Sequence, residues 1–192
     1  MSEFARVAAG PCADHSALAT LVAAELGQSP GPRLEGRLTG LARQLSRGVP
    51  EDELRGLGVL LARRFRPDGR GALLLPEALE TGLAHAATVA VIGAGIAGRA
   101  GLRIGLVGNG RRLYLAHERE SAPSVLDPAA PGSPVDARRL GVDLYWRCAH
   151  ESAGALLDHV MERAGRGLDL ATVETCTMLR RTLALVPSCD PD

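Results

Sequence analysis

The chain has 192 residues, enough for one globular domain with at most a small appendage. Its 22 basic residues, all of them arginine, balance 22 acidic residues, so the formal net charge at pH 7 is zero. Zero net charge gives no electrostatic case for binding nucleic acid or an anionic membrane, and we expect neither as a partner. The chain begins without the basic-then-apolar pattern of a signal peptide, and we expect a cytoplasmic protein.

The N-terminal part of the chain has the apolar periodicity of helices. We predict helices from Asp14 to Gly27, from Arg33 to Arg47 and from Pro50 to Phe65. A turn is predicted at Arg66-Pro67-Asp68-Gly69, followed by a short helix from Glu77 to Thr81.

The stretch from Gly82 to Pro128 contains the longest apolar run. Within it, Gly93-Ala94-Gly95-Ile96-Ala97-Gly98 matches the G-x-G-x-x-G fingerprint of dinucleotide-binding proteins. A phosphate loop would require Val89–Ile92 to be a strand, and a doubly wound domain would need further parallel strands that the flanking helical patterns do not offer. We therefore predict one buried helix from Leu83 to Ala100, and keep a nucleotide-binding protein as an alternative.

Short strands are predicted after this helix at Arg103–Val107, Leu113–Ala116 and Ser124–Leu126, with a hairpin turn at Gly108-Asn109-Gly110. They would form a small antiparallel sheet packed on the buried central helix. The expected fold class is therefore α+β and mostly helical.

A linker rich in proline, alanine and glycine ends at Pro134, so we divide the chain into a core of residues 1–134 and a helical hairpin of residues 135–192. The hairpin is predicted to contain a helix from Asp143 to Ala164 and another from Leu170 to Leu185, capped by Asp169. One such unit cannot bury its own apolar face, so we expect it to dock on the core.

This order of parts resembles the SirB type of transglutaminase-like protein, whose C-terminal hairpin is tetratricopeptide-like. The resemblance covers nearly the whole chain and implies a papain-like core. It is carried by Gly101-Leu102 after the core helix, the strand at Leu113–Leu115, Asp127-Pro128, and Leu183-Ala184-Leu185-Val186-Pro187.

In transglutaminase-like enzymes a cysteine begins the core helix, and a histidine and an aspartate lie on neighbouring strands. The resemblance places these three positions at about Ala86, Arg112 and Asp127. No cysteine lies between Cys12 and Cys148, so the thiolate nucleophile is missing and we expect neither thiol protease nor transglutaminase activity.

The altered positions suggest an anion pocket. A helix N-terminus carries unpaired N–H groups and partial positive charge, and arginine offers a planar fork to sulfate, phosphate or carboxylate. The expected anion-binding residues are Arg112, Arg111, His85 and Asn109. The expected candidates for a general base are Asp127, His117 and Glu118.

We expect no cofactor and no metal site. The four cysteines, Cys12, Cys148, Cys176 and Cys189, are far apart and form no C-x-x-C pair, which is typical of reduced thiols in the cytosol. His150 and His159 are nine residues apart, which is not the spacing of two ligands on one helix.

The function these expectations favour is a repurposed, non-thiol biosynthetic cyclase of specialised metabolism. It would bind a small anionic molecule and promote intramolecular displacement or elimination of sulfate or phosphate, for example in closing an aziridine-type ring. The alternative is a catalytically dead transglutaminase-like scaffold that binds a protein partner through its C-terminal helices.

Overall fold

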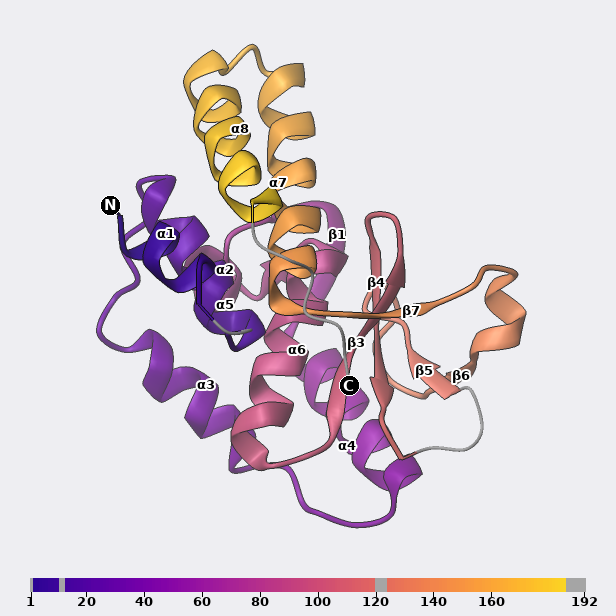
Figure 1. The fold of residues 1–192 in the computed structure, drawn as a ribbon. Coiled ribbons are helices and arrows are strands. Elements are labelled where there is room, and N and C mark those ends of the chain that lie inside the picture. The colour runs from indigo at the N-terminus through magenta and orange to yellow at the C-terminus, as the bar shows by residue number, and fades with distance from the viewer. Residues whose placement is uncertain (1, 11–12, 120–123, 186–192) are drawn as a thin grey trace.

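A central helix, α6 (Ala86–Ala100), packs against one face of an antiparallel sheet (Figure 1). The computed structural model describes residues 2–10, 13–119 and 124–185. The larger sheet has five strands in the order β6-β5-β4-β3-β7. The predicted α+β class, with a small antiparallel sheet on a buried helix, is confirmed. The strands are β3 (Ile104–Asn109), β4 (Arg112–His117), β5 (Ser124–Leu126), β6 (Val135–Asp136) and β7 (Tyr145–Arg147).

Helix α6 is buried along its whole middle, from residue 87 to residue 97. Its glycines allow neighbouring elements to come close, because a Cβ on Gly93 would lie 2.7 Å from Cδ1 of Leu115. A Cβ on Gly95 would lie 2.5 Å from Cβ of Ser16, on the opposite side. The G-x-G-x-x-G stretch is therefore helical throughout, and its interpretation as a strand followed by a phosphate loop is wrong.

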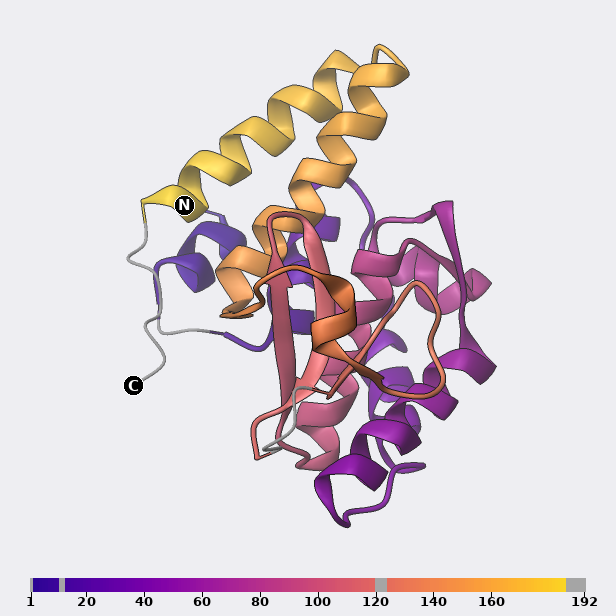
Figure 2. The same ribbon diagram turned by 90° about the vertical axis from the view of Figure 1, so that its right-hand side faces the viewer.

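Five helices precede α6 in the described part of the chain; α2 to α5 pack around α6, and α1 packs on α2 (Figures 1 and 2). Helix α2 begins after Asp14, whose carboxylate accepts hydrogen bonds from the amides of Ser16 and Ala17, as a capping residue should. Helix α3 ends at Ala42 rather than at the predicted Arg47. The five helices are α1 (Glu3–Ala8), α2 (His15–Glu25), α3 (Leu34–Ala42), α4 (Pro50–Arg64) and α5 (Leu75–Thr81).

Two predicted boundaries before α6 are wrong. The turn predicted at residues 66–69 belongs to strand β1 (Arg66–Ala72), which pairs in parallel with β2 (Leu83–Ala84). The amide of His85 donates to the carbonyl of Ala72, so the backbone immediately before α6 is already paired. Helix α6 accordingly begins at Ala86 and not at the predicted Leu83.

The prediction of a helix beginning at Asp143 is also wrong for its first residues, because α7 begins only at Ala149. A 3-10 turn, η1 (Ala137–Leu140), leads into β7, which pairs with β3 at the edge of the sheet. The ring of Trp146 covers Gly105 and remains 43% exposed. Residues 135–147 therefore complete the sheet, and the hairpin starts only with α7 (Ala149–Arg166).

The turn between β3 and β4 is shorter than predicted. Gly108 pairs with Leu113 and Asn109 pairs with Arg112, so both glycine and asparagine belong to the β3–β4 ladder. Gly110 has a φ of 57°, in the left-handed region that the reversal of the chain requires.

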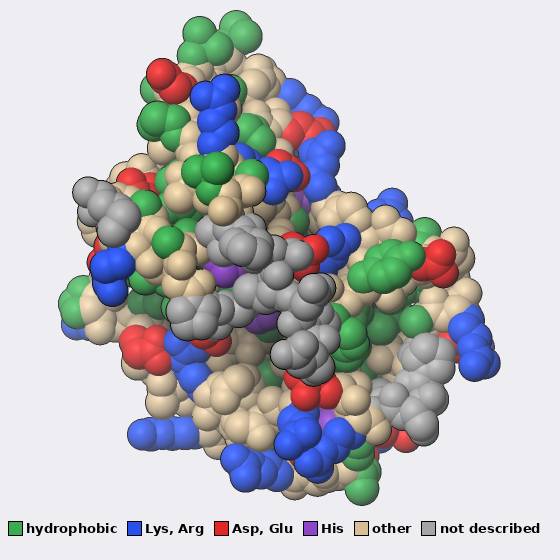
Figure 3. Space-filling view, viewed as in Figure 1, with side chains coloured by type: hydrophobic (Ala, Val, Ile, Leu, Met, Phe, Trp, Pro, Cys, Tyr) green, Lys and Arg blue, Asp and Glu red, His purple; other side chains and the backbone are tan. Residues whose placement is uncertain are grey.

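Helices α7 and α8 (Leu170–Ala184) form an antiparallel hairpin whose far end projects from the body (Figures 1 and 2). Leu157 and Leu179 of the hairpin share an apolar cluster with Phe4 and Leu18, so the hairpin packs on α1 and α2. No described helix is both long and apolar enough to cross a membrane. On the face shown in Figure 3, arginine and acidic side chains are interspersed. Val186, Pro187, Cys12 and Cys189 lie outside the described residues.

A candidate anion pocket at the start of helix α6

A hollow of about 500 Å³ opens at the N-terminal end of α6. Its walls come from the start of α6, the start of β4, the loop after β5 and one face of α7. Three positions that the sequence singled out, Ala86, Arg112 and Asp127, all line it. The remaining lining residues are His85, Ala87, Arg111, Leu113, Tyr114, Pro128, Ala129, His159 and Glu162.

The first turn of α6 leaves one amide for a ligand. The amides of Thr88 and Val89 both donate to the carbonyl of His85, and the amide of Ala87 donates to Nδ1 of the His85 ring at 3.3 Å. The amide of Ala86 has no acceptor within the described part of the chain. A helix N-terminus with an unpaired N–H and a positive dipole end is favourable for an anion.

The two arginines at the start of β4 differ in their partners. Arg111 donates from Nη1 to Oε2 of Glu162 at 2.6 Å, and Glu162 also pairs with Arg166. The exposed guanidinium of Arg112 makes no hydrogen bond or ion pair with any residue that the structure describes. Arg112 is therefore the guanidinium available to an anion in this pocket.

Asp127 is held by a turn immediately after β5. Its Oδ1 accepts a hydrogen bond from the amide of Ala129 at 2.8 Å, which is the local bond expected of an aspartate in an Asx turn. The side chain is half-buried, and Oδ2 has no donor among the described residues. The turn fixes the carboxylate at the pocket wall and leaves one oxygen for a ligand.

Two histidine rings, those of His85 and His159, are in contact in the pocket. The ring centroids of His85 and His159 are 4.3 Å apart, with the rings tilted by 51°. Burial first, then the neighbouring His159 and Arg163, together lower the pKa of His85 to about 4, and Glu162 opposes the change. His85 is therefore neutral near pH 7.

The structure does not bring His117, Glu118 or Asn109 to this pocket. His117 and Arg112 are at opposite ends of β4, roughly 17 Å apart at about 3.4 Å per residue. Nε2 of His117 lies 3.0 Å from Oε2 of Glu53 in the interior. Glu118 is exposed just beyond the same end, and Asn109 donates from Nδ2 to the carbonyl of Asp143. The expectation that His117, Glu118 and Asn109 share one site with Arg112 is therefore wrong.

Sequence reasoning missed His159 and Glu162. They reach the pocket because α7 crosses the start of α6, a tertiary contact that no local spacing reveals.

Within residues 2–10, 13–119 and 124–185, no group of three histidine, cysteine or acidic side chains is placed to hold a metal ion. Cys176 is buried, and burial raises the pKa of its thiol to about 11, with Asp169 adding to the effect. Such a thiol is unsuited to act as a nucleophile.

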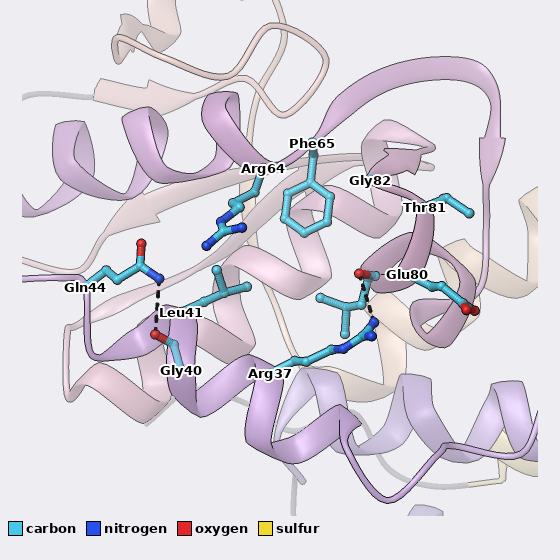
Figure 4. A pocket seen from close by; sticks show the side chains of 10 residues that line it. Arg37, Gly40, Leu41, Gln44, Arg64, Phe65, Glu80, Thr81 and Gly82 are labelled. Carbon is cyan, nitrogen blue, oxygen red and sulfur yellow. Dashed lines mark hydrogen bonds between the residues drawn. The ribbon is translucent and has the colours of Figure 1, made fainter.

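A second hollow, of about 530 Å³, lies between α3, α5 and the end of α4 (Figure 4). Its polar side chains are largely bonded to backbone, since Arg37 donates to the carbonyl of Leu79 and Gln44 to that of Gly40. No helix begins at this hollow among its lining residues, which include the apolar side chains of Leu41 and Phe65. The hollow at α6 is the better candidate, because a cation, a carboxylate and a helix N-terminus converge there.

No family model matches the chain, and no curated protein or solved structure shows a significant match to it.

Proposed function

We propose that this protein is a non-thiol enzyme of small-molecule metabolism with an anion pocket at the start of α6. The pocket would hold a sulfate, phosphate or carboxylate of the substrate between Arg112 and the unpaired amide of Ala86. The observation that supports this most strongly is the position of Arg112. Its guanidinium has no described partner and lines the same hollow as the helix N-terminus.

The reaction class that suits such a site is intramolecular displacement of a sulfate or phosphate ester. An amine of the substrate attacks the carbon that bears the ester, a C–N bond forms and the C–O bond breaks. The leaving anion departs with the bonding pair onto Arg112, and the amine gives its proton to a base in the pocket. Closure of an aziridine-type ring is the example we propose, because a site that holds both ends of a substrate favours cyclisation.

A transglutaminase-like ancestry is part of the proposal. It is supported by the packing of α6 on β3 and β4 and by the meeting of Ala86, Arg112 and Asp127 in one hollow. These are the positions that the resemblance assigns to the cysteine, histidine and aspartate of those enzymes. With alanine and arginine in place of the first two, the site retains a carboxylate and gains a cation.

Titration calorimetry with sodium sulfate tests the pocket. Replacing Arg112 by alanine removes a charge-assisted bidentate contact, worth roughly 1.5–3 kcal/mol, so affinity should fall about tenfold to a hundredfold. Arg139→Ala is the matched control, because Arg139 is exposed in η1 and lines none of the hollows described above. Equal sulfate affinities for wild type and Arg112→Ala would overturn the proposal.

The alternative function, a scaffold for a protein partner, is favoured by the tip of the hairpin. Leu168 and Leu170 are 82% and 74% exposed there, and Leu168 has a φ of 57°, which is uncommon for a residue with a side chain. For a scaffold, Leu170→Asp should abolish binding of the cognate partner in a pull-down with both proteins purified, while Arg112→Ala should leave it intact. The opposite pattern would exclude the hairpin tip as the binding surface.

A further inference from the structure

The hydrogen bonds of His85 fix which ring nitrogen carries its proton. Its Nδ1 accepts the amide N–H of Ala87 as the N-cap of α6, so Nδ1 has no proton. The proton of the neutral ring is therefore on Nε2. A proton added at Nδ1 would break the cap and place a positive charge at the positive end of the helix.

The hydrogen bond of His159 fixes its ring in the same way. Nε2 of His159 lies 3.3 Å from the carbonyl oxygen of Arg111. A carbonyl can only accept, so Nε2 is the protonated nitrogen and Nδ1 has a lone pair. Nδ1 of His159 has no hydrogen bond to any described residue.

We infer that His159 is the proton acceptor of the pocket and that His85 is a neutral hydrogen-bond donor to the bound anion. The inference rests on the proposed function, since it assigns roles within the same pocket. His159 would take the amine proton on Nδ1 while Nε2–H remains bonded to Arg111. His85 would donate from Nε2 to an oxygen of the leaving sulfate or phosphate and would not change its charge.

The other charged groups that face the two rings are less suited to take the proton. Glu162 is paired with Arg111 and Arg166, and Arg163 is a cation that donates to the carbonyls of Gly71 and Gly69. Asp127 is the remaining acid in the lining. Its Oδ1 is bound in a turn, and its Oδ2 has no donor among the described residues, so Asp127 is the competing acceptor that the Asp127→Asn variant below tests. Imidazole is the side chain whose ordinary titration lies near neutral pH, where proton transfer to a base is most effective.

Proton uptake on sulfate binding tests the assignment without a substrate. An anion beside an imidazole favours its protonated form, so wild type should take up part of a proton for each sulfate bound. Calorimetry in buffers of different ionisation enthalpy measures this uptake. His159→Gln, which keeps an N–H for the Arg111 carbonyl, should abolish uptake while sulfate still binds. Asp127→Asn should retain uptake.

His85 is tested by affinity rather than by proton uptake. Asparagine is also a good N-cap, so His85→Asn keeps the acceptor for the Ala87 amide and loses the Nε2–H donor. Sulfate affinity should fall roughly threefold to tenfold, as for loss of one hydrogen bond, with proton uptake unchanged. An unchanged affinity would remove His85 from the inference.

A nitrogen-15 NMR spectrum of the wild-type protein provides an independent check of the tautomers at pH 7. Both rings should carry their proton on Nε2, and a proton on Nδ1 of either would overturn the inference. So would uptake that survives in His159→Gln or is lost in Asp127→Asn. Wild type that binds no sulfate would instead overturn the proposed function itself, so the two failures are distinguishable.

Discussion

Nε2 of His117 lies 3.0 Å from Oε2 of Glu53, and the pair joins the far end of β4 to the first turns of α4. Both side chains are buried, with 3% and 10% of their surface exposed. Oε1 of Glu53 also accepts the amide of Gly48 at 2.9 Å, so both carboxylate oxygens have donors. His117 is therefore a buried residue of the core that links β4 to α4.

Glu53→Ala should destabilise the fold by about 1–3 kcal/mol, because it leaves the buried imidazole of His117 without its hydrogen-bond partner. His117→Gln should also lower the midpoint of urea unfolding, yet leave sulfate affinity within about twofold of wild type. Arg112→Ala should show the reverse pattern. A His117 variant that is as stable as wild type but loses sulfate binding would show that His117 belongs to the anion-binding site.

Stability should fall as the pH is lowered from 7 toward 4, in part because of His85. Burial first, then His159 and Arg163, lower the folded pKa of His85 from 6.5 to about 4. Between these two pKa values the unfolded chain binds more protons at His85 than the folded chain does. The contribution of His85 to the free energy of unfolding is therefore complete above pH 6.5 and is lost as the pH falls to about 4. Burial lowers the pKa of His15 as well, with Asp14 opposing it.

Thermal unfolding measured across this pH range checks that prediction. The melting temperature of His85→Asn should depend less steeply on pH than that of wild type, with His15 providing the remaining slope. Parallel curves for the two proteins would show that His85 is equally easy to protonate in the folded and unfolded chain.

Two glycines of α6, three residues apart, should respond oppositely to alanine. A Cβ on Gly95 would lie 2.5 Å from Cβ of Ser16, so Gly95→Ala should cost roughly 1–3 kcal/mol by overpacking against α2. A Cβ on Gly98 would lie 3.7 Å from Oδ2 of Asp14, an ordinary contact. Gly98→Ala should be neutral or stabilising by up to about 1 kcal/mol, from helix propensity. Urea unfolding of both variants makes the comparison, and equal effects would contradict the packing of α6 on α2.

The burial of α6 could be predicted because a helix of alanine, valine, isoleucine and glycine has no polar face to expose. The boundary at Cys148 could not, because cysteine is not among the usual capping residues. Here the side chain of Glu151 accepts the amide of Cys148 and completes a capping box. Without a recognisable start signal at Cys148, the sequence pattern predicts a helix that also covers residues 143–147, where the structure has β7 and the two residues before it.

Part of the candidate site could be placed before the structure only through the resemblance to transglutaminase-like proteins. That resemblance implied positions at about Arg112 and Asp127, and both residues line the pocket. His117 could not be separated from Arg112 without knowing where the strand ends. His159 enters the pocket through the packing of α7 across α6, and such contacts depend on the tertiary fold rather than on spacing along the chain.

The most direct test of the anion pocket is anomalous diffraction from crystals of the wild-type protein soaked in sodium selenate, which has the shape and charge of sulfate. The account predicts a selenium peak in the hollow at α6, from a selenate whose oxygens lie within hydrogen-bond distance of the Arg112 guanidinium and the amide of Ala86, and no such peak in Arg112→Ala. Selenium peaks only at other arginines of the wild-type protein, with the hollow at α6 empty, would contradict it.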